Sequence, residues 1–215
     1  MAAFIIVQLW FLGHVAYWVK FNPSSTAFMR GRLELMRDDD AKAKLRHQWA
    51  PYQKISVHLK RSVMAAEDSK FMEHRGFDWD GIKVAWERNK REGDIVAGGS
   101  TISQQLAKNL FFSGKRTWWR KTQEAVVTVM LEALMSKQRI LEIYLNVIEW
   151  GDGVFGAEEA ARKHFGRSAK NLTPEQAARL AAILPAPRRW SPTGSVASRR
   201  AGLILQKMQY AAPRE

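Results

Sequence analysis

A glutamate at the edge of an apolar helical stripe is the first group in this sequence suited to acid–base chemistry. Glu67 follows Leu59, Val63 and Ala66, which recur at helical spacing, so it should lie at the margin of the buried face. Partial burial disfavours a charged carboxylate and moves its pKa towards that of a useful general base. The alternative is an ordinary acid at a helix end, with Asp68 beside it.

The segment "GGSTISQQLAKN", residues 98–109, places many small and polar groups beside an apolar run. Thr101 and Gln104 fit a capping box, so a helix should begin here, after a loop that contains Gly98 and Gly99. Glycine allows a ligand to approach the backbone closely, and helix N-termini attract anions. The segment therefore favours a binding site for a polar or anionic group.

The helix predicted after that loop has two distinct faces. Apolar residues recur at i, i+4 and i+8, and polar residues at i, i+3 and i+4. They are Ile102, Leu106 and Leu110 on the first face and Gln105, Lys108 and Asn109 on the second. We expect the first face to pack in the core and the second to bind a ligand, although an ordinary solvated surface helix is the alternative.

A third group of charged side chains lies at the entrance of a long apolar stretch, residues 117–137. Arg120 and Glu124 are one turn apart, with Lys121 next to them. On a surface this would be a local ion pair worth only a few tenths of a kcal/mol. Residues 125–135 are apolar on nearly every side, which predicts a central, buried helix and makes these charges costly unless they are used.

Composition narrows the class of protein. A chain of 215 residues with 46% hydrophobic content can bury one sizeable core. The net charge of +13 favours an anionic partner, which leaves nucleic acid, a membrane surface or a phosphorylated substrate open. The absence of cysteine excludes a disulfide framework and a cysteine zinc site, and His74 has no spaced partner that would indicate a metal.

The first residues read as a membrane anchor. Residues 2–19 carry no charged side chain and would reach roughly 27 Å as a helix, close to the thickness of a hydrocarbon core. Tyr17, Trp18 and Lys20 suit the interface, although Gln8 and His14 weaken the span. A cleaved signal peptide is the alternative, but neither a basic leader nor an A-x-A-like site is present. We predict an anchor at 1–20, a juxtamembrane segment at 21–48 and a globular domain at 49–215.

The rest of the pattern is helical. Thr173, Pro174 and Gln176 form a second helix start with a capping box, and no period-2 run of β-branched residues occurs. We therefore predict an all-α, mainly helical fold.

Several blocks of sequence, taken in order, give a more specific result. They are "EDSKFMEHRGFD", "GGSTISQQLAKN", "RKTQE", "RILEIYLN", "GDGVFGAEEAARKHFG" and "LTPEQAARLAA". Together they closely resemble the peptidoglycan glycosyltransferases that polymerise lipid II in bacterial cell walls, over about residues 49–192. Neither S-x-x-K nor K-T-G occurs, so the chain resembles the short, monofunctional form rather than the form fused to a transpeptidase.

The resemblance implies a lysozyme-like helical fold with a cleft, held by a single helix on the outer, periplasmic face of the bacterial inner membrane. It implies inverting glycosyl transfer that makes a β-1,4-linked glycan and releases undecaprenyl diphosphate. The partners would be lipid II, the growing glycan strand, the phospholipid membrane and proteins of cell division or elongation, with no nucleic acid. A divalent cation such as Mg²⁺ is also implied, but the sequence has no dedicated cage of metal ligands, so no tightly bound cofactor is expected.

Site residues follow from the same resemblance. Glu67 matches the catalytic glutamate and Glu124 the second essential one. The residues that match substrate-binding positions are Asp68, Phe71, His74, Ser100, Gln105, Lys108, Asn109, Arg120 and Lys121. Of these, Lys108, Arg120 and Lys121 would stabilise the departing diphosphate.

Two other classes of protein remain open from the sequence. A lytic enzyme of the same shape would cut glycan strands with the same glutamate, but it would need no cationic group for a diphosphate. A non-enzymatic membrane-binding or nucleic-acid-binding module would account for the net charge, but its basic residues are scattered and no recognised binding motif is present.

Overall fold

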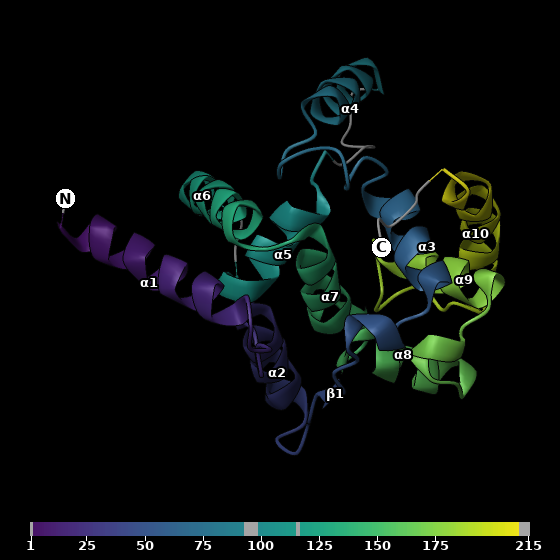
Figure 1. Cartoon of the computed structure of the whole chain (residues 1–215). Coiled ribbons are helices and arrows are strands. Elements are labelled where there is room, and N and C mark those ends of the chain that lie inside the picture. The colour runs from purple at the N-terminus through teal and green to yellow at the C-terminus, as the bar shows by residue number, and fades with distance from the viewer. Residues whose placement is uncertain (1, 93–98, 115–116, 211–215) are drawn as a thin grey trace.

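The computed structural model describes residues 2–92, 99–114 and 117–210. In this part the chain forms ten α-helices, two short 3₁₀ helices and a small three-stranded sheet (Figure 1). The helices are α1 (Ala2–Trp18), α2 (Ala27–Asp39), α3 (Val57–Glu67), α4 (Trp79–Glu92), α5 (Ile102–Phe111), α6 (Trp118–Leu134), α7 (Lys137–Val147), α8 (Ala157–Phe165), α9 (Pro174–Ile183) and α10 (Ser195–Met208), with η1 (Tyr52–Lys54) and η2 (Ala169–Asn171). The prediction of a mainly helical fold is confirmed.

The strands correct the expectation of an all-α fold. β1 (Arg46–His47) pairs in parallel with β3 (Val154–Phe155), which pairs antiparallel with β2 (Glu149–Gly151). Strands of two or three residues are too short to show an alternating pattern, so periodicity could not reveal them. The sheet joins the segment that follows α2 to the middle of the domain.

Polar side chains set where the main helices begin. The two predicted capping boxes are present, at Thr101 with Gln104 and at Thr173 with Gln176. Most of the apolar stretch at 117–137 forms α6, which the Thr117 side chain caps. Its end belongs to the next helix, because the Ser136 side chain accepts a hydrogen bond from the backbone of Arg139 and starts α7.

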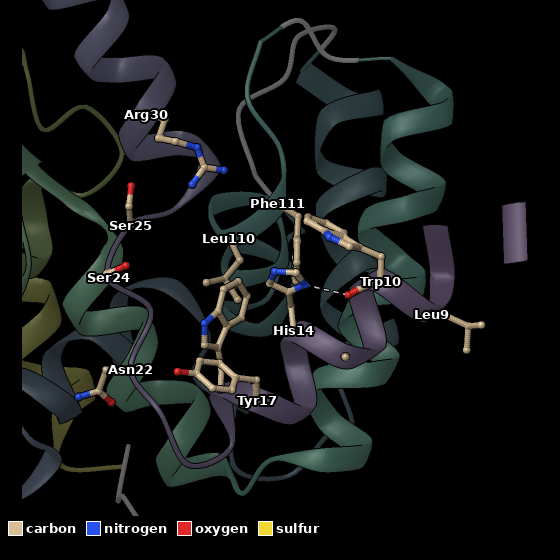
Figure 2. Close-up of a pocket in the computed structure, with 12 residues that line it drawn as sticks. Leu9, Trp10, His14, Tyr17, Asn22, Ser24, Ser25, Arg30, Leu110 and Phe111 are labelled. Atoms are coloured by element: carbon tan, nitrogen blue, oxygen red, sulfur yellow. Dashed lines mark hydrogen bonds between the residues drawn. The ribbon is translucent and has the colours of Figure 1, made fainter. Parts of the chain in front are cut away.

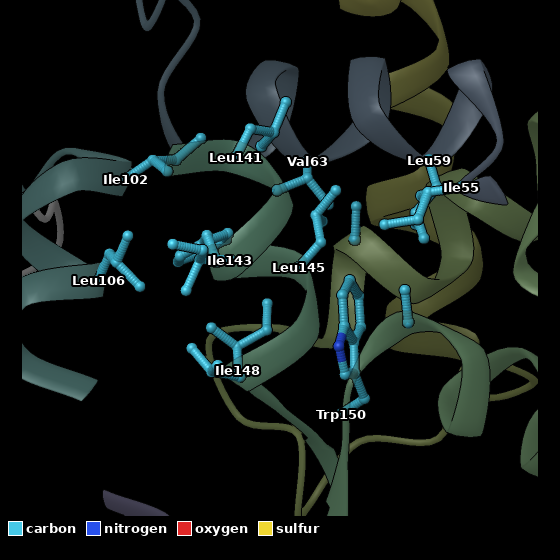
Figure 3. Close-up of a cluster of buried hydrophobic side chains, with 14 of the residues drawn as sticks. Ile55, Leu59, Val63, Ile102, Leu106, Leu141, Ile143, Leu145, Ile148 and Trp150 are labelled. Carbon is cyan, nitrogen blue, oxygen red and sulfur yellow. The ribbon is translucent and has the colours of Figure 1, made fainter. Parts of the chain in front are cut away.

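The central helix is α7, not α6. Its apolar side chains and those of α3 and α5 meet in one cluster (Figure 3), in which Ile140, Ile143 and Leu145 are fully buried. α6 buries only one side, since Val129 is 56% exposed and Leu134 is 41% exposed. The prediction of a buried helix at 125–135 was therefore wrong. An apolar sequence on every side of a helix does not require the protein itself to cover every side.

α1 extends away from the domain beside α6 (Figure 1). Phe11, Val15 and Trp18 are buried against the domain, while most other large apolar side chains of α1 are exposed. The Gln8 amide donates a hydrogen bond to Gln123 of α6 at 2.7 Å. Among the described residues, no helix combines the length and apolar character needed to cross a membrane, so the predicted spanning anchor at 1–20 is not confirmed.

α2 is held against the domain by charge. The Nε atom of Arg32 lies 3.3 Å from Oε1 of Glu149. The same guanidinium group also pairs with Asp152, in the turn between β2 and β3. α2 also packs on α5. α2, which lies in the segment predicted to be juxtamembrane, is thus fixed beside the helix that carries the predicted polar face.

Candidate active site

Glu67 is the last residue of α3, and its carboxylate contacts α5. Its Oε2 atom accepts a hydrogen bond from Gln105 Nε2 at 2.8 Å. Burial raises the pKa of Glu67, although the Gln105 hydrogen bond and the positive charges of Arg200 and Lys108 oppose this effect. The carboxyl group therefore releases its proton at a higher pH than an exposed glutamate, as the sequence predicted.

Gln105 is itself held from the other side. The Tyr144 hydroxyl donates to Gln105 Oε1 at 2.9 Å, so the amide nitrogen is turned towards Glu67. Burial raises the pKa of Tyr144 well above its usual value, which keeps the hydroxyl protonated and able to donate. Sequence reasoning missed this residue, because a tyrosine in the apolar run of α7 is read as part of the core.

Lys108 lies on the same face of α5 and is only partly exposed. Its ammonium group forms no hydrogen bond or ion pair with any residue in the described ranges. Burial lowers the pKa of Lys108; Glu124 and Glu67 oppose this effect, and the nearby Lys121 and Arg120 reinforce it. A partly desolvated cation without a fixed protein partner is suited to bind an external anion.

Glu124 is buried in the first turns of α6, between two bases. Arg120 Nε lies 3.0 Å from Glu124 Oε1, and Lys121 Nζ lies 3.3 Å from Oε2. Arg120 also donates to the Gly114 carbonyl oxygen at 2.6 Å. The ion pair predicted from the spacing is present, and the carboxylate fixes both cations at the entrance of α6.

Asp68 and His74 tie the end of α3 to the start of α5. The Asp68 carboxylate accepts hydrogen bonds from the Ile102 backbone N–H at 3.0 Å and from His74 Nε2 at 2.9 Å. The Gly76 backbone N–H donates to His74 Nδ1, so the imidazole proton is on Nε2. Both side chains are used within the protein, and this assigns them to positioning α5 rather than to open substrate contact.

Phe71 was predicted to bind substrate, but it is fully buried. Its ring packs in the core, and Lys137 Nζ lies 4.5 Å from the ring centre. In this conformation Phe71 has no surface that a ligand could reach. The sequence block that contains it does not separate residues that contact substrate from residues that support them.

Two cavities flank the Glu67–Gln105 hydrogen bond. One, of about 210 Å³, is lined by Glu67 and Ser100 among others. The other, of about 170 Å³, is lined by Gln105, Lys108 and Asn109 together with Tyr144. The structure thus brings the predicted polar face of α5 to a surface hollow beside Glu67.

Gly99, which precedes α5, lies at the first cavity. Gly99 lines it, and a Cβ atom at Gly99 would lie 3.2 Å from the backbone of Ile82. The small residue is therefore needed for close packing against α4 as well as for access to the cavity. Gly98 lies outside the described residues.

Comparison with known proteins identifies the family of this chain. The family described as Transglycosylase matches residues 36–209. The chain is 58% identical to a protein named biosynthetic peptidoglycan transglycosylase from Methylobacillus flagellatus, over 96% of this chain and 91% of that protein. Proteins of the same name from Nitrosospira multiformis and Chromobacterium violaceum are 55% and 53% identical, over 99% and 98% of this chain and 93% of each of those proteins.

The chain belongs to the transglycosylase family. In this family member Arg200 of α10 is a further charged residue at the site, because its positive charge lowers the pKa of Glu67. The Arg200 guanidinium also lies 5.3 Å from the ring centre of Trp190. The sequence blocks used above end before α10, so sequence reasoning missed Arg200.

Among the described residues, the candidate site offers no ready cage for a metal ion. In the parts of the chain described here, no three His, Asp or Glu side chains converge as metal ligands. The Glu124 carboxylate is already paired with two cations, Arg120 and Lys121. We therefore assign no step of the reaction to a divalent cation.

Proposed function

We propose that this transglycosylase polymerises lipid II into β-1,4-linked peptidoglycan strands and releases undecaprenyl diphosphate. One observation carries the proposal. Glu67, a carboxyl group with a raised pKa, interacts electrostatically with Lys108. Lys108 in turn interacts electrostatically with Glu124 and with its two paired cations, Arg120 and Lys121. Membership of the family and the names of the relatives support the same reaction.

Glu67 acts as the general base. It takes the proton of the acceptor sugar hydroxyl while that oxygen attacks the anomeric carbon of the donor. The bond from the anomeric carbon to the diphosphate oxygen breaks, and its electron pair leaves with the diphosphate. Attack opposite the leaving group inverts the anomeric centre, through a transition state of oxocarbenium character.

Lys108, Arg120 and Lys121 stabilise the negative charge that develops on the diphosphate. Arg120 has the planar fork that matches two phosphate oxygens, whereas Lys108 acts as a point charge. Glu124 keeps the two α6 cations in place through the ion pairs described above. Ser100 on one side of the Glu67–Gln105 hydrogen bond, and Gln105 and Asn109 on the other, contact the sugars. Asp68, His74 and Phe71 support these residues from within.

An apolar groove supports a lipid-linked donor. A cavity of about 450 Å³ between α1 and α6 is lined by Phe4, Val7, Trp119 and other apolar residues, and Arg120 also lines it. A lipid chain in this groove would bring its phosphates to the cationic cluster. This arrangement favours synthesis over the lytic alternative, since cleavage of a neutral glycan has no diphosphate to stabilise.

Peptidoglycan synthesis implies an enzyme of the cell envelope that acts outside the cytoplasm. We further propose that residues 1–20 anchor the chain in the bacterial inner membrane by a single helix, with 21–48 as the juxtamembrane segment and 49–215 as the periplasmic catalytic domain. The exposed apolar side chains of α1, such as Ile6 and Leu9, support this placement. Division or elongation proteins of the cell complete the proposed set of partners, and nucleic acid is not among them.

The test is a polymerisation assay with the purified full-length chain and purified lipid II. We expect long glycan strands, and inhibition by the phosphoglycolipid moenomycin, as the family resemblance implies. The same protein incubated with finished glycan should leave it intact. Cleavage of that glycan without polymerisation of lipid II would establish the lytic alternative instead.

A further inference from the structure

A larger cavity, of about 760 Å³, lies between α1, the end of α5 and the start of α2 (Figure 2). None of the predicted site residues lines it. Its volume is within the range of about 300–1,000 Å³ that is common for small-molecule sites. The cavity is therefore separate from the proposed site of the donor sugar and its diphosphate, and it is large enough for another ligand.

One wall of the cavity is polar. Arg30 points into it from α2, and Ser24 and Ser25 line it from the preceding loop (Figure 2). The side chains of these three residues form no hydrogen bond or ion pair with the residues that the structure describes. An arginine beside two free hydroxyl groups is suited to bind phosphate oxygens.

The opposite wall is apolar and continues onto the outside of α1. Leu9, Gly13 and Phe111 form this side of the cavity. Leu9 is 60% exposed and Trp10 is 52% exposed, so the apolar surface extends from the cavity along the helix. Tyr17, which also lines the cavity, is of the type that gathers at the level of lipid headgroups.

We propose that this cavity binds one anionic phospholipid of the bilayer. The phosphate contacts Arg30, Ser24 and Ser25, and an acyl chain lies along α1 at Leu9 and Gly13. The argument is charge complementarity at one wall and continuity with the exposed apolar face of α1 at the other. This ligand is distinct from the substrate of the proposed function, and it would fix α1 against α2 and α5.

The test uses the full-length chain in detergent micelles, titrated with phosphatidylglycerol or with phosphatidylcholine of the same acyl chains. Native mass spectrometry measures the bound fraction. We expect one tightly bound phosphatidylglycerol and weaker binding of phosphatidylcholine. Arg30→Gln should weaken phosphatidylglycerol binding about five-fold, the usual effect of one basic residue near an anionic lipid surface. Arg37→Gln is the matched control, because Arg37 is on the same helix outside the cavity.

A second variant tests the apolar wall. No atom lies within 4 Å of a Cβ atom built at Gly13, so the backbone accepts a side chain there and Gly13→Leu places an isobutyl group in the cavity. We expect it to weaken binding of both lipids, whereas Ala16→Leu, at an exposed position of α1 that does not line the cavity, should have no effect. Thermal unfolding of each variant confirms that the fold is retained.

Three results would overturn the proposal. The first is equal affinity for the two lipids with no effect of Arg30→Gln. The second is displacement of phosphatidylglycerol by millimolar inorganic phosphate, which would show that the tail contributes nothing. The third is displacement by undecaprenyl diphosphate together with a raised KM for lipid II in Arg30→Gln, which would assign the cavity to the substrate.

Polymerisation of lipid II by the Arg30→Gln and Gly13→Leu variants is measured in parallel. We expect both rates to match that of the parent protein, so failure of this proposal can be distinguished from failure of the proposed function.

Discussion

Tyr144 and Glu67 are joined by a single side chain, that of Gln105, which accepts from the tyrosine at 2.9 Å and donates to the glutamate at 2.8 Å. The tyrosine therefore decides which end of the amide faces the carboxylate. With the amide turned over, its oxygen would face the Glu67 oxygens and repel them. A buried residue of α7 thus orients the amide that donates to the proposed general base.

Tyr144→Phe removes the hydroxyl that holds the amide. We expect the Gln105 bond to Glu67 to weaken, and because that bond lowers the pKa of Glu67, the acid limb of the pH–rate profile should move to higher pH. The measurement is the initial rate of lipid II polymerisation against pH. Tyr52→Phe is the control, since Tyr52 lines neither cavity beside Glu67. An acid limb that does not move in Tyr144→Phe would contradict the positioning role.

Glu67→Gln keeps the size of the side chain and removes the base. General-base catalysis contributes about 10²–10⁴-fold, so we expect a loss of polymerisation rate in that range with little change in unfolding temperature. Because the pKa of Glu67 is raised, activity of the parent protein should fall as the pH decreases through a value above the ordinary 4.5. Near-normal turnover of Glu67→Gln would reject the assignment.

Lys108 should set the alkaline limb of the pH–rate profile for lipid II polymerisation. Burial lowers its pKa from the ordinary 10.5, so the cation is lost, and the rate falls, at a lower pH than for an exposed lysine. Lys108→Arg stays charged and should move the alkaline limb to higher pH, while Lys42→Arg, at an exposed position, should not.

Removal of a cation tests the diphosphate contact directly. Lys108→Met and Arg120→Met should each lower the polymerisation rate about 10²–10³-fold, the usual effect of losing one group that stabilises developing negative charge. Isothermal titration with the glycolipid inhibitor separates loss of binding from loss of rate. Unchanged rates in both variants would remove these residues from the mechanism.

Asp68→Ala leaves two donors without an acceptor, the Ile102 backbone N–H and the His74 ring. Each donor that loses its partner costs about 1–3 kcal/mol, so for the two together we expect a melting temperature lower by about 4–24 °C. Asp80→Ala is the matched change at an exposed ion pair and should shift the melting temperature little. Equal melting temperatures for the two variants would show that Asp68 does not hold α5.

The local features of the site could be predicted from the sequence. Capping at Thr101, the two faces of α5 and the Arg120–Glu124 pair all depend on residues at most four positions apart. Spacing along a helix fixes such contacts before any tertiary structure is considered.

Features that depend on distant segments could not be predicted. Tyr144 reaches Gln105 across 39 positions, and Arg46 pairs with Val154 in strands too short to show a pattern. The burial of Phe71 depends on which side of its loop packs inward, and residue spacing does not specify this. The sequence also did not show that α7, and not α6, is the central buried helix. Both segments are apolar, and only tertiary packing decides which one the rest of the protein buries.

The hydrogen bond from Gln8 to Gln123 has a mechanical consequence. A helix with only apolar contacts could rotate about its own axis with little change in energy. The Gln8 amide reaches Gln123 at only one rotational setting of α1. Gln123 immediately precedes Glu124. The hydrogen bond therefore connects α1 to the part of α6 that carries the proposed diphosphate-binding cations. The hydrogen bond therefore favours one orientation of α1 relative to the helix that carries Glu124.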